Sequence, residues 1–399
     1  MSCDSLVKYF KDISKTVVQL SRDEPRLEHP GLEFPNDIKS RVEVLLQSLP
    51  ELDGIEKKTL RRISGGGSIS VARIATSVLE RLSLGDQPES ICADLVDFVC
   101  QKDVPNYYLA GISGIALADK LTLSDQVSLV TADNIAPNWA REFVFRINRL
   151  GRIEGAGHEP LRPQAALMIS NNQQVLFPSG SRSHEEGRLS METVRKLERM
   201  IISCITLASD TAAPTITAKT SWIDHPAYSY HGLMGGSGGK SPGEKQTSRY
   251  DEFDKNLTRD LFARVSVLDE GVQLTVLLAA ELLCSSRLHE SPVNRAIDLG
   301  IALEVIFLHG VKNTTELGYR AATHAAFFLG SDAEERRTIH DAVRDAYGAR
   351  SEAVHTGKLE KTRYIENHFQ ADRLCRQALV KLVIDGGFPE DWSSLIFAT

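Results

Sequence analysis

Two residues near the C-terminus could together perform acid–base chemistry on a phosphate ester. Arg350 and His355 are separated by four residues in the segment Arg350-Ser-Glu-Ala-Val-His355-Thr-Gly. Histidine titrates near neutral pH and can accept or donate a proton, whereas arginine stays charged and binds phosphate oxygens in pairs. The pair suits cleavage of a phosphate ester by proton transfer and positive charge, without a metal or other cofactor. We expect Ser351 and Lys358 to contact phosphate beside it.

An apolar helix upstream must pack against this segment. The stretch from Val293 to Leu308 is apolar on nearly every face, so we expect it inside a helical bundle. It carries two carboxylates, Asp298 and Glu304, and a carboxylate buried without a partner costs several kcal/mol or more. The nearest suitable donors downstream are Arg320, Arg350 and His355. This requirement predicts that the Arg350–His355 segment folds back onto the apolar helix.

Further helices complete the expected bundle. An alanine-rich helix from Glu316 to Leu329 should end at Gly330. Ser331 or Asp332 should cap the next helix, which Gly348 weakens just before Arg350. A last helix is expected from about Tyr364 to Ile384. The polar residues would then meet at a junction between helices.

Three segments together resemble an Apea-like HEPN domain. They are Arg295-Ala-Ile-Asp-Leu-Gly-Ile-Ala-Leu-Glu304, Gly318-Tyr-Arg-Ala-Ala and Tyr347-Gly-Ala-Arg-Ser-Glu-Ala-Val-His355-Thr-Gly. The signature of the HEPN superfamily is an arginine, four to six residues and a histidine, and here the gap is four. The three segments also occur in the order expected for this family, which makes the resemblance more specific than the spacing alone. The resemblance covers at most the last 150 residues or so.

The resemblance implies an activity, an assembly and two kinds of role. HEPN ribonucleases are commonly dimers whose two motifs face one cleft, which implies an RNA substrate, a homodimer through the C-terminal bundle, and 2′,3′-cyclic phosphate and 5′-hydroxyl products. Arg350 and His355 would be catalytic, and Glu304 or Asp298 would orient them. The family context suggests a toxin-like or anti-phage (antiviral) defence effector that responds to an unknown trigger. Some HEPN-like domains are interaction modules without activity, and this alternative stays open.

Composition sets the broad class of the protein. The chain has 399 residues, 42% hydrophobic and 25% charged, with a net charge of −7. This length and composition are typical of a soluble protein with two or three domains. The negative net charge is not that of a general nucleic-acid binder. The six cysteines are scattered without a Cys-x-x-Cys pair, and the N-terminus has no secretory apolar core. We expect a cytoplasmic location and no membrane association.

The fold class expected is α+β, mainly α, with three regions. Residues 1–105 should be helical, with helices at Leu6–Leu20 and Ile38–Leu49 and a flexible break at Ser64–Ser68. Residues 106–250 should be β-rich, with Phe143–Ile147 among the strands and a loop-like stretch from Thr211 to Arg249, and could serve as a sensor or specificity module. Residues 251–399 should form the HEPN-like antiparallel bundle.

Other motifs are weaker candidates for chemistry. The tract from Met234 to Ser241 ends like a phosphate-binding loop, but methionine stands where the first glycine belongs and Pro242-Gly243 replaces the helix start. Nucleotide binding at this tract is therefore a minor alternative to a flexible loop. His158-Glu159 lacks a second histidine at the required spacing, and Asp224, His225 and His231 form a polar loop more readily than a metal site. We expect no bound metal.

Overall fold

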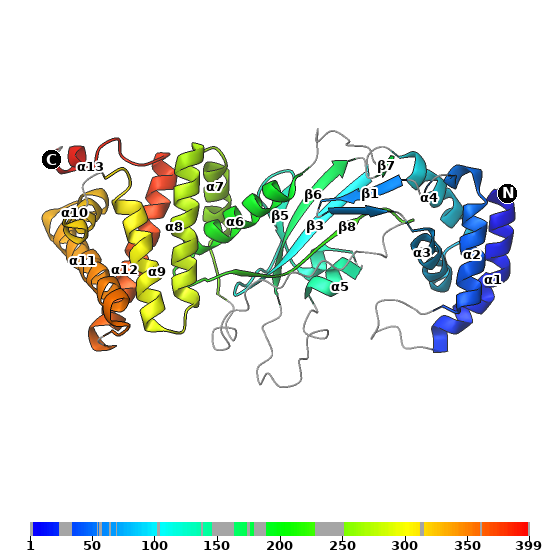
Figure 1. The fold of residues 1–399 in the computed structure, drawn as a ribbon, viewed down its shortest axis with the longest axis horizontal. Helices are drawn as coiled ribbons and strands as arrows, with labels where there is room; N and C mark the ends of the chain where they lie inside the picture. Colours follow the sequence, from blue (N-terminus) through cyan, green and yellow to red (C-terminus); the bar gives the residue numbers. More distant parts are fainter. Residues whose placement is uncertain are drawn as a thin grey trace.

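Helices occupy both ends of an elongated molecule and a β-sheet lies between them (Figure 1). The structure is a computed structural model. It describes residues 3–23, 34–53, 55, 58–63, 65–68, 70–101, 104–136, 139–145, 163–173, 176–178, 189–227, 251–311, 315–359 and 361–397. The expected class, α+β and mainly α, is confirmed.

Four helices and a short 3-10 turn form the N-terminal end. They are α1 (Cys3–Asp23), α2 (Asn36–Gln47), η1 (Pro50–Leu52), α3 (Val71–Leu84) and α4 (Pro88–Cys100). Buried residues recur every third or fourth position, as Ile74, Val78 and Leu82 do in α3, so one face of each helix packs inward. Gly85, with a φ of +92°, ends α3 in the left-handed conformation that glycine adopts without strain.

A small sheet corrects one expectation. The antiparallel strands β1 (Lys58–Arg62), β2 (Gly65–Ser68) and β7 (Leu176–Pro178) pair in the order β2-β1-β7. The Ser64–Ser68 stretch, predicted as a flexible break, therefore contains a strand. Its glycines pair through backbone hydrogen bonds with residues such as Leu60, which need no side chain on β2.

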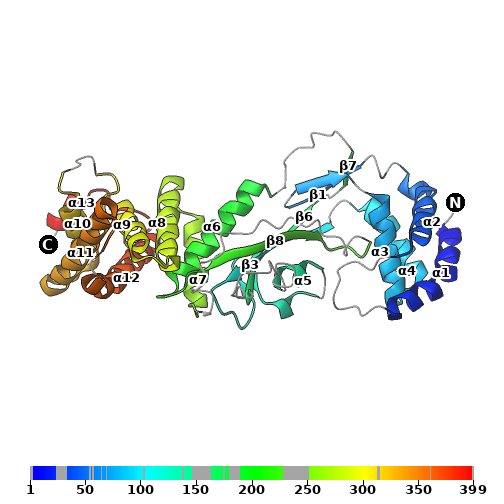
Figure 2. The same cartoon turned by 60° about the horizontal axis from the view of Figure 1, so that its bottom comes forward.

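The larger sheet is antiparallel, with strand order β4-β5-β6-β3-β8. Its strands are β3 (Val104–Ser113), β4 (Leu121–Thr122), β5 (Val127–Val130), β6 (Ala165–Gln173) and β8 (Thr215–Ile223). Alternate residues of β3 face opposite layers. Tyr108 and Ala110 join the core beneath α6 (Met191–Leu207), and Leu109 joins the core beneath α5 (Trp139–Phe145). Figure 2 shows the two helices on opposite faces of the sheet.

Two predictions in this region are wrong. The predicted strand Phe143–Ile147 is part of helix α5 up to Phe145, because Ala140, Phe143 and Val144 recur at helical spacing and pack on the sheet. The loop expected from Thr211 onward contains β8. It is rich in β-branched and aromatic residues, and it pairs with β3 from Asn106 to Ser113, with a shift in register between Ala110 and Ile112.

The C-terminal helices form the bundle, a name used here for α7 to α12. Their bounds are α7 (Lys255–Ser266), α8 (Glu270–Leu288), α9 (Pro292–Phe307), α10 (Leu317–Leu329), α11 (Ala333–Thr356) and α12 (Lys361–Asp385), followed by α13 (Trp392–Phe397). Side-chain caps begin several of them: Asp254, Asp269 and Asp332 each accept hydrogen bonds from backbone N–H groups. The Glu335 carboxylate accepts a hydrogen bond from the backbone N–H of Ser331, so the residue just before the cap is bonded to the first turn of α11.

Helix α8 is central to the bundle. Among the described residues it is the one helix whose length and composition would allow it to cross a membrane. It packs against α9, α6 and α12, and its buried face joins the same core cluster as theirs. The helix is therefore a core element of the bundle.

A buried arginine ties the sheet to the bundle. Arg287 of α8 forms a two-point ion pair with Asp372 of α12, at 2.8 and 2.9 Å, and both side chains are less than a tenth exposed. Its Nη1 also donates to the carbonyl oxygens of Thr206, Ser209 and Ala212, at 2.9 to 3.2 Å. These carbonyl oxygens lie at and just after the end of α6, where the last carbonyl groups of a helix have no partner within the helix. One guanidinium therefore joins α6, α8 and α12.

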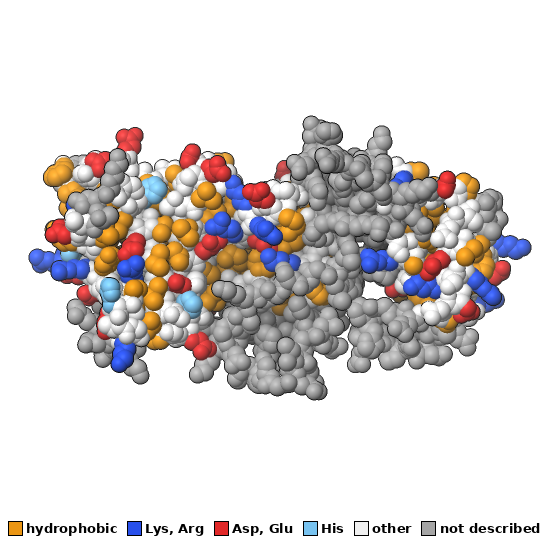
Figure 3. All heavy atoms as spheres, in the orientation of Figure 1, with side chains coloured by type: hydrophobic (Ala, Val, Ile, Leu, Met, Phe, Trp, Pro, Cys, Tyr) orange, Lys and Arg blue, Asp and Glu red, His pale blue; other side chains and the backbone are white. Residues whose placement is uncertain are grey.

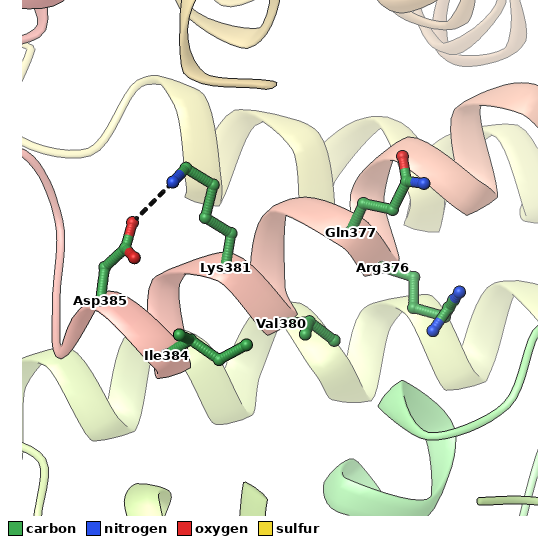
Figure 4. A pocket seen from close by; sticks show the side chains of 6 residues that line it. All are labelled: Arg376, Gln377, Val380, Lys381, Ile384 and Asp385. Atoms are coloured by element: carbon green, nitrogen blue, oxygen red, sulfur yellow. Dashed lines mark ion pairs between the residues drawn. The ribbon is translucent and has the colours of Figure 1, made fainter. Parts of the chain in front are cut away.

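Asp372→Ala should destabilise the protein strongly, because it leaves the Arg287 charge buried with its main partner removed. We expect a loss of about 3–5 kcal/mol in the free energy of unfolding. The control is Asp385→Ala, which removes an exposed ion pair with Lys381 on the same helix (Figure 4). Denaturant titration should show a change of about 0.5 kcal/mol or less for the control. Equal losses in the two variants would contradict the role of Arg287.

Candidate functional site

Arg350 lies against α9 at a point where the two helices approach closely. Gly300 of α9 makes the approach possible: a Cβ atom there would lie 2.5 Å from Arg350 Cγ and closer still to its Cβ. The guanidinium extends to Glu304, one turn further along α9, with 3.5 Å between Nη2 and Oε2. The arginine and glutamate side chains are 27% and 22% exposed. The pair is therefore partly open to water, and its charges are not deeply buried as the apolar helix suggested.

Tyr347 completes this cluster. Its hydroxyl lies near the Glu304 carboxylate, and burial together with that negative charge raises the pKa of the phenol. Its ring packs on α10 at Gly318, where a Cβ atom would lie 2.7 Å from the ring. Glu304 thus holds both Arg350 and Tyr347, which lie one turn apart on α11. Tyr347 belongs to the quoted motif, but its spacing of three from Arg350 was the only sign of this role.

Asp298 belongs to a different cluster, which corrects the expectation that it would orient Arg350 or His355. Its Oδ2 accepts from Ser285 Oγ at 2.5 Å and lies 2.9 Å from His289 Nε2. The turn between α8 and α9 is short, so the end of α8 is brought against the first turns of α9. Ser285 lies near the same nitrogen, Nε2, that faces Asp298, so these residues do not form a serine–histidine–aspartate relay.

His355 points away from Arg350. Both lie in the continuous helix α11, where five residues correspond to a rotation of about 140°. His355 is exposed in the last turn, and within the described part of the chain its side chain forms no hydrogen bond or ion pair. The sequence predicted that Arg350 and His355 lie at a junction between two helices, but both belong to the last turns of the single helix α11. Gly357, with a φ of +66°, ends that helix, and the exposed Lys358 follows it.

A surface hollow lies on the same side of α11 as His355. It has a volume of about 680 Å³ and is formed by the start of α10 and by α11. Its lining residues are Glu316, Leu317, Gly318, Tyr319, Arg344, Tyr347, Gly348 and Ser351. Ser351 precedes His355 by four residues, about one helical turn, so the two share a face. The sequence motif therefore divides: Arg350 faces α9, while Ser351 and His355 face the hollow and its rim.

A second hollow of about 380 Å³ runs along α12 (Figure 4). Its charged residues have structural partners. Arg376 pairs with Asp210 at 2.6 Å and donates to the Leu207 carbonyl, and Lys381 pairs with Asp385 at 3.0 Å. This hollow lacks a free group for chemistry among its described residues.

The weaker motifs do not form a site in the described residues. The glycine-rich tract from Gly232 to Gly243, His158-Glu159 and His231 lie outside them. His225 is buried and lies 3.2 Å from Asp97. Within the described ranges no group of three or more histidine, cysteine or acidic side chains could hold a metal. His324 is a buried core residue whose Nδ1 lies 2.6 Å from the Phe307 carbonyl oxygen and whose ring stacks on Trp392.

Two glycine substitutions should change stability in opposite directions. Gly300→Ala places a methyl group against Arg350, so α9 and α11 must separate, and we expect a loss of about 1–3 kcal/mol. Gly348→Ala is the matched control in α11, because nothing lies within 4 Å of a Cβ atom at Gly348. Alanine there should stabilise the protein by about 0.5–1 kcal/mol. Thermal and denaturant melts measure both, and a neutral Gly300→Ala would show that the close contact is not required.

Comparisons with known proteins add no relative to this picture. Searches with the whole chain against protein-family models, curated proteins and solved structures give no match. The likeness to Apea-like HEPN domains therefore rests on the quoted motif residues, and the function must be inferred from the geometry of α9, α10 and α11.

Proposed function

We propose that this protein is a metal-independent endoribonuclease of the HEPN type that acts in the cytoplasm. The observation that carries the proposal is the state of the two motif residues. Arg350 is held by Glu304 beside Tyr347, and His355 is exposed, without a partner among the described residues, one turn beyond Ser351 at the rim of an open hollow. An exposed imidazole with both nitrogens free can exchange protons with a substrate.

The reaction would need two proton-transfer groups at one phosphate. The 2′-oxygen forms a bond to phosphorus as its proton passes to one imidazole. The bond to the 5′-oxygen breaks as that oxygen takes a proton from a second imidazole. Arginine stabilises the charge that builds on the phosphate oxygens. The products are a 2′,3′-cyclic phosphate and a 5′-hydroxyl.

A homodimer would supply the second imidazole. One copy presents a single motif histidine, and its Arg350 and His355 lie about 140° apart around α11, so they cannot readily grip one phosphate together. Val354, beside His355, is 51% exposed. Figure 3 shows further apolar side chains gathered over α8 and α9, where Leu274 and Leu278 are exposed. Exposed apolar surface of this kind supports association of two bundles.

The N-terminal helices and the sheet would then control the nuclease. The sheet shares its core with the bundle through α6, so a ligand that shifts the sheet can act on the bundle. We propose that residues 1–250 sense a trigger, as expected of a toxin-like or antiviral defence effector.

One observation favours the alternative that the domain is an interaction module without activity. The contacts of Arg350 with Gly300 and Glu304 are those of a residue that holds two helices together. In that case the motif arginine would be structural and His355 would have no chemical role. The two functions differ in what His355 does, and this decides the experiment.

His355→Ala should abolish cleavage of total cellular RNA in the presence of EDTA. Loss of the proton-transfer group should lower the rate by about 10²–10⁴-fold. The exposed side chain should be dispensable for folding, with a change in stability of about 0.5 kcal/mol or less. Arg337→Ala, an exposed residue on the same helix that lies outside the hollow, is the control and should keep most activity. Chemical analysis of the cut ends should find cyclic phosphates. Equal cleavage by wild type and His355→Ala would exclude the proposed site.

The assembly makes a separate prediction. Light scattering at micromolar concentration should give twice the mass of one chain. If the active site needs both copies, activity per molecule should fall when the protein is diluted below its dissociation constant. A monomer that cuts RNA with constant specific activity at every concentration would contradict the shared site.

A further inference from the structure

The hollow between α10 and α11 contains several features that the cleavage chemistry does not use. Arg344 lines it with an exposed guanidinium that has no hydrogen bond or ion pair among the described residues. Ser351 also lines it and forms no side-chain hydrogen bond there. The opposite wall carries Glu316, so the hollow has one positive and one negative group. Within this lining the Arg344 guanidinium is the group that can bind a phosphate.

Gly348 is the clearest sign that the hollow has been kept open. It lies in the interior of the 24-residue helix α11, where glycine costs about 1 kcal/mol relative to alanine. Packing does not explain this cost, since a Cβ atom at Gly348 would meet nothing within 4 Å. Gly300 and Gly318, by contrast, are required by Arg350 and by the ring of Tyr347. A side chain at position 348 would project into the hollow, so its absence preserves the space.

The aromatic ring of Tyr319 lies at the edge of the same hollow. Tyr319 is 58% exposed, which is high for so large an aromatic side chain. Its ring contacts His340 edge to face, with centroids 5.6 Å apart, so one side is supported while a face stays open. An exposed and supported ring is a platform on which a nucleobase stacks, worth about 1–3 kcal/mol per base.

The backbone at the rim is strained. Glu316, which precedes α10, has a φ of +54° and is the one non-glycine residue with a positive φ in the described part of the chain. This conformation costs about 1–2 kcal/mol for a residue with a Cβ atom. Strain of this kind is concentrated at binding and active sites. It sets the position from which Leu317, Gly318 and Tyr319 begin α10.

We infer that the hollow is a nucleotide subsite. The base stacks on Tyr319 and the phosphate binds Arg344 and Ser351. Gly348 forms the bottom of the site, where its lack of a side chain leaves room for the ligand. The volume of about 680 Å³ falls within the range of small-ligand sites. Ser351 and His355 are about 6 Å apart along the helix axis, so a nucleotide in the hollow places its neighbour at His355. The identification of the nucleotide as part of an RNA strand rests on the proposed function. The stacking on Tyr319 and the phosphate contacts are inferred independently of that function.

Binding of an RNA that cannot be cut tests this subsite directly. A fluorescent 2′-O-methyl RNA oligonucleotide is titrated with the full-length protein, and anisotropy reports the dissociation constant. Gly348→Met fills the floor and Arg344→Ala removes the phosphate contact. Each should weaken binding by about tenfold, the loss expected for one charged hydrogen bond or one stacked base. Arg337→Ala, two turns from Arg344 on the same face and outside the hollow, is the control and should change affinity by less than about twofold.

Gly348→Met should also raise the melting temperature, because methionine favours a helix more than glycine does. A protein that becomes more stable while binding less cannot have lost affinity by unfolding. AMP serves as a competitor: weak competition supports an RNA strand as the occupant, and competition as strong as that of the oligonucleotide supports a free nucleotide in the same site. Wild-type affinity in both Gly348→Met and Arg344→Ala would overturn the subsite.

A separate cleavage assay distinguishes this inference from the proposed function. If the wild type binds RNA through the hollow but leaves total RNA intact, the nuclease proposal fails and the subsite stands. If the wild type cuts RNA and the two hollow variants bind and cut equally well, the subsite fails and the nuclease proposal stands.

Discussion

The two-point ion pair between Arg287 and Asp372 is the constraint on which the arrangement of the molecule depends. A guanidinium so far from water must have its hydrogen bonds satisfied, and Arg287 satisfies them by joining three elements. The carbonyl oxygens that it bonds lie at the end of α6, the helix that also covers one face of the larger sheet. The position of the bundle is thereby set relative to the sheet. A change in the sheet can reach α8 and α12 through a stiff contact.

Small residues provide the second constraint, and they act where α11 meets its neighbours. Gly300 admits the base of the Arg350 side chain, and Gly318 admits the ring of Tyr347. With both helices this close, Glu304 lies within reach of Arg350 and Tyr347 at once. Position 348 differs because its space is empty. Glycine thus appears in this region for two physical reasons, close packing and the preservation of a cavity.

Much of the helical structure could be predicted from local patterns. Asp332, one of the two caps predicted, begins α11 by accepting hydrogen bonds from the backbone of Glu334 and Glu335. The larger errors came from interactions between segments distant in sequence. Strand β8 exists because it pairs with β3, and glycine strand β2 exists because β1 lies beside it. Helix α3, whose apolar spacing is regular, was not predicted although the pattern was present.

The candidate site shows why its residues were only partly predictable. The rule that a carboxylate in an apolar helix must find a donor named Arg350 as one of three candidates, and Arg350 is the one that pairs with Glu304. It could not choose the donor for Asp298, because Ser285 and His289 come near only through the short turn between α8 and α9.

The linear spacing of a motif also says nothing about orientation until the helix around it is known. If α11 had broken at Gly348, Arg350 and His355 could have faced each other across a junction. Because α11 continues to Thr356, the four-residue gap rotates them about 140° apart. The face of His355 is then shared with Ser351 and Arg344, which precede it by four and eleven residues. On a continuous helix these intervals, rather than the gap in the motif, determine which side chains can meet one substrate.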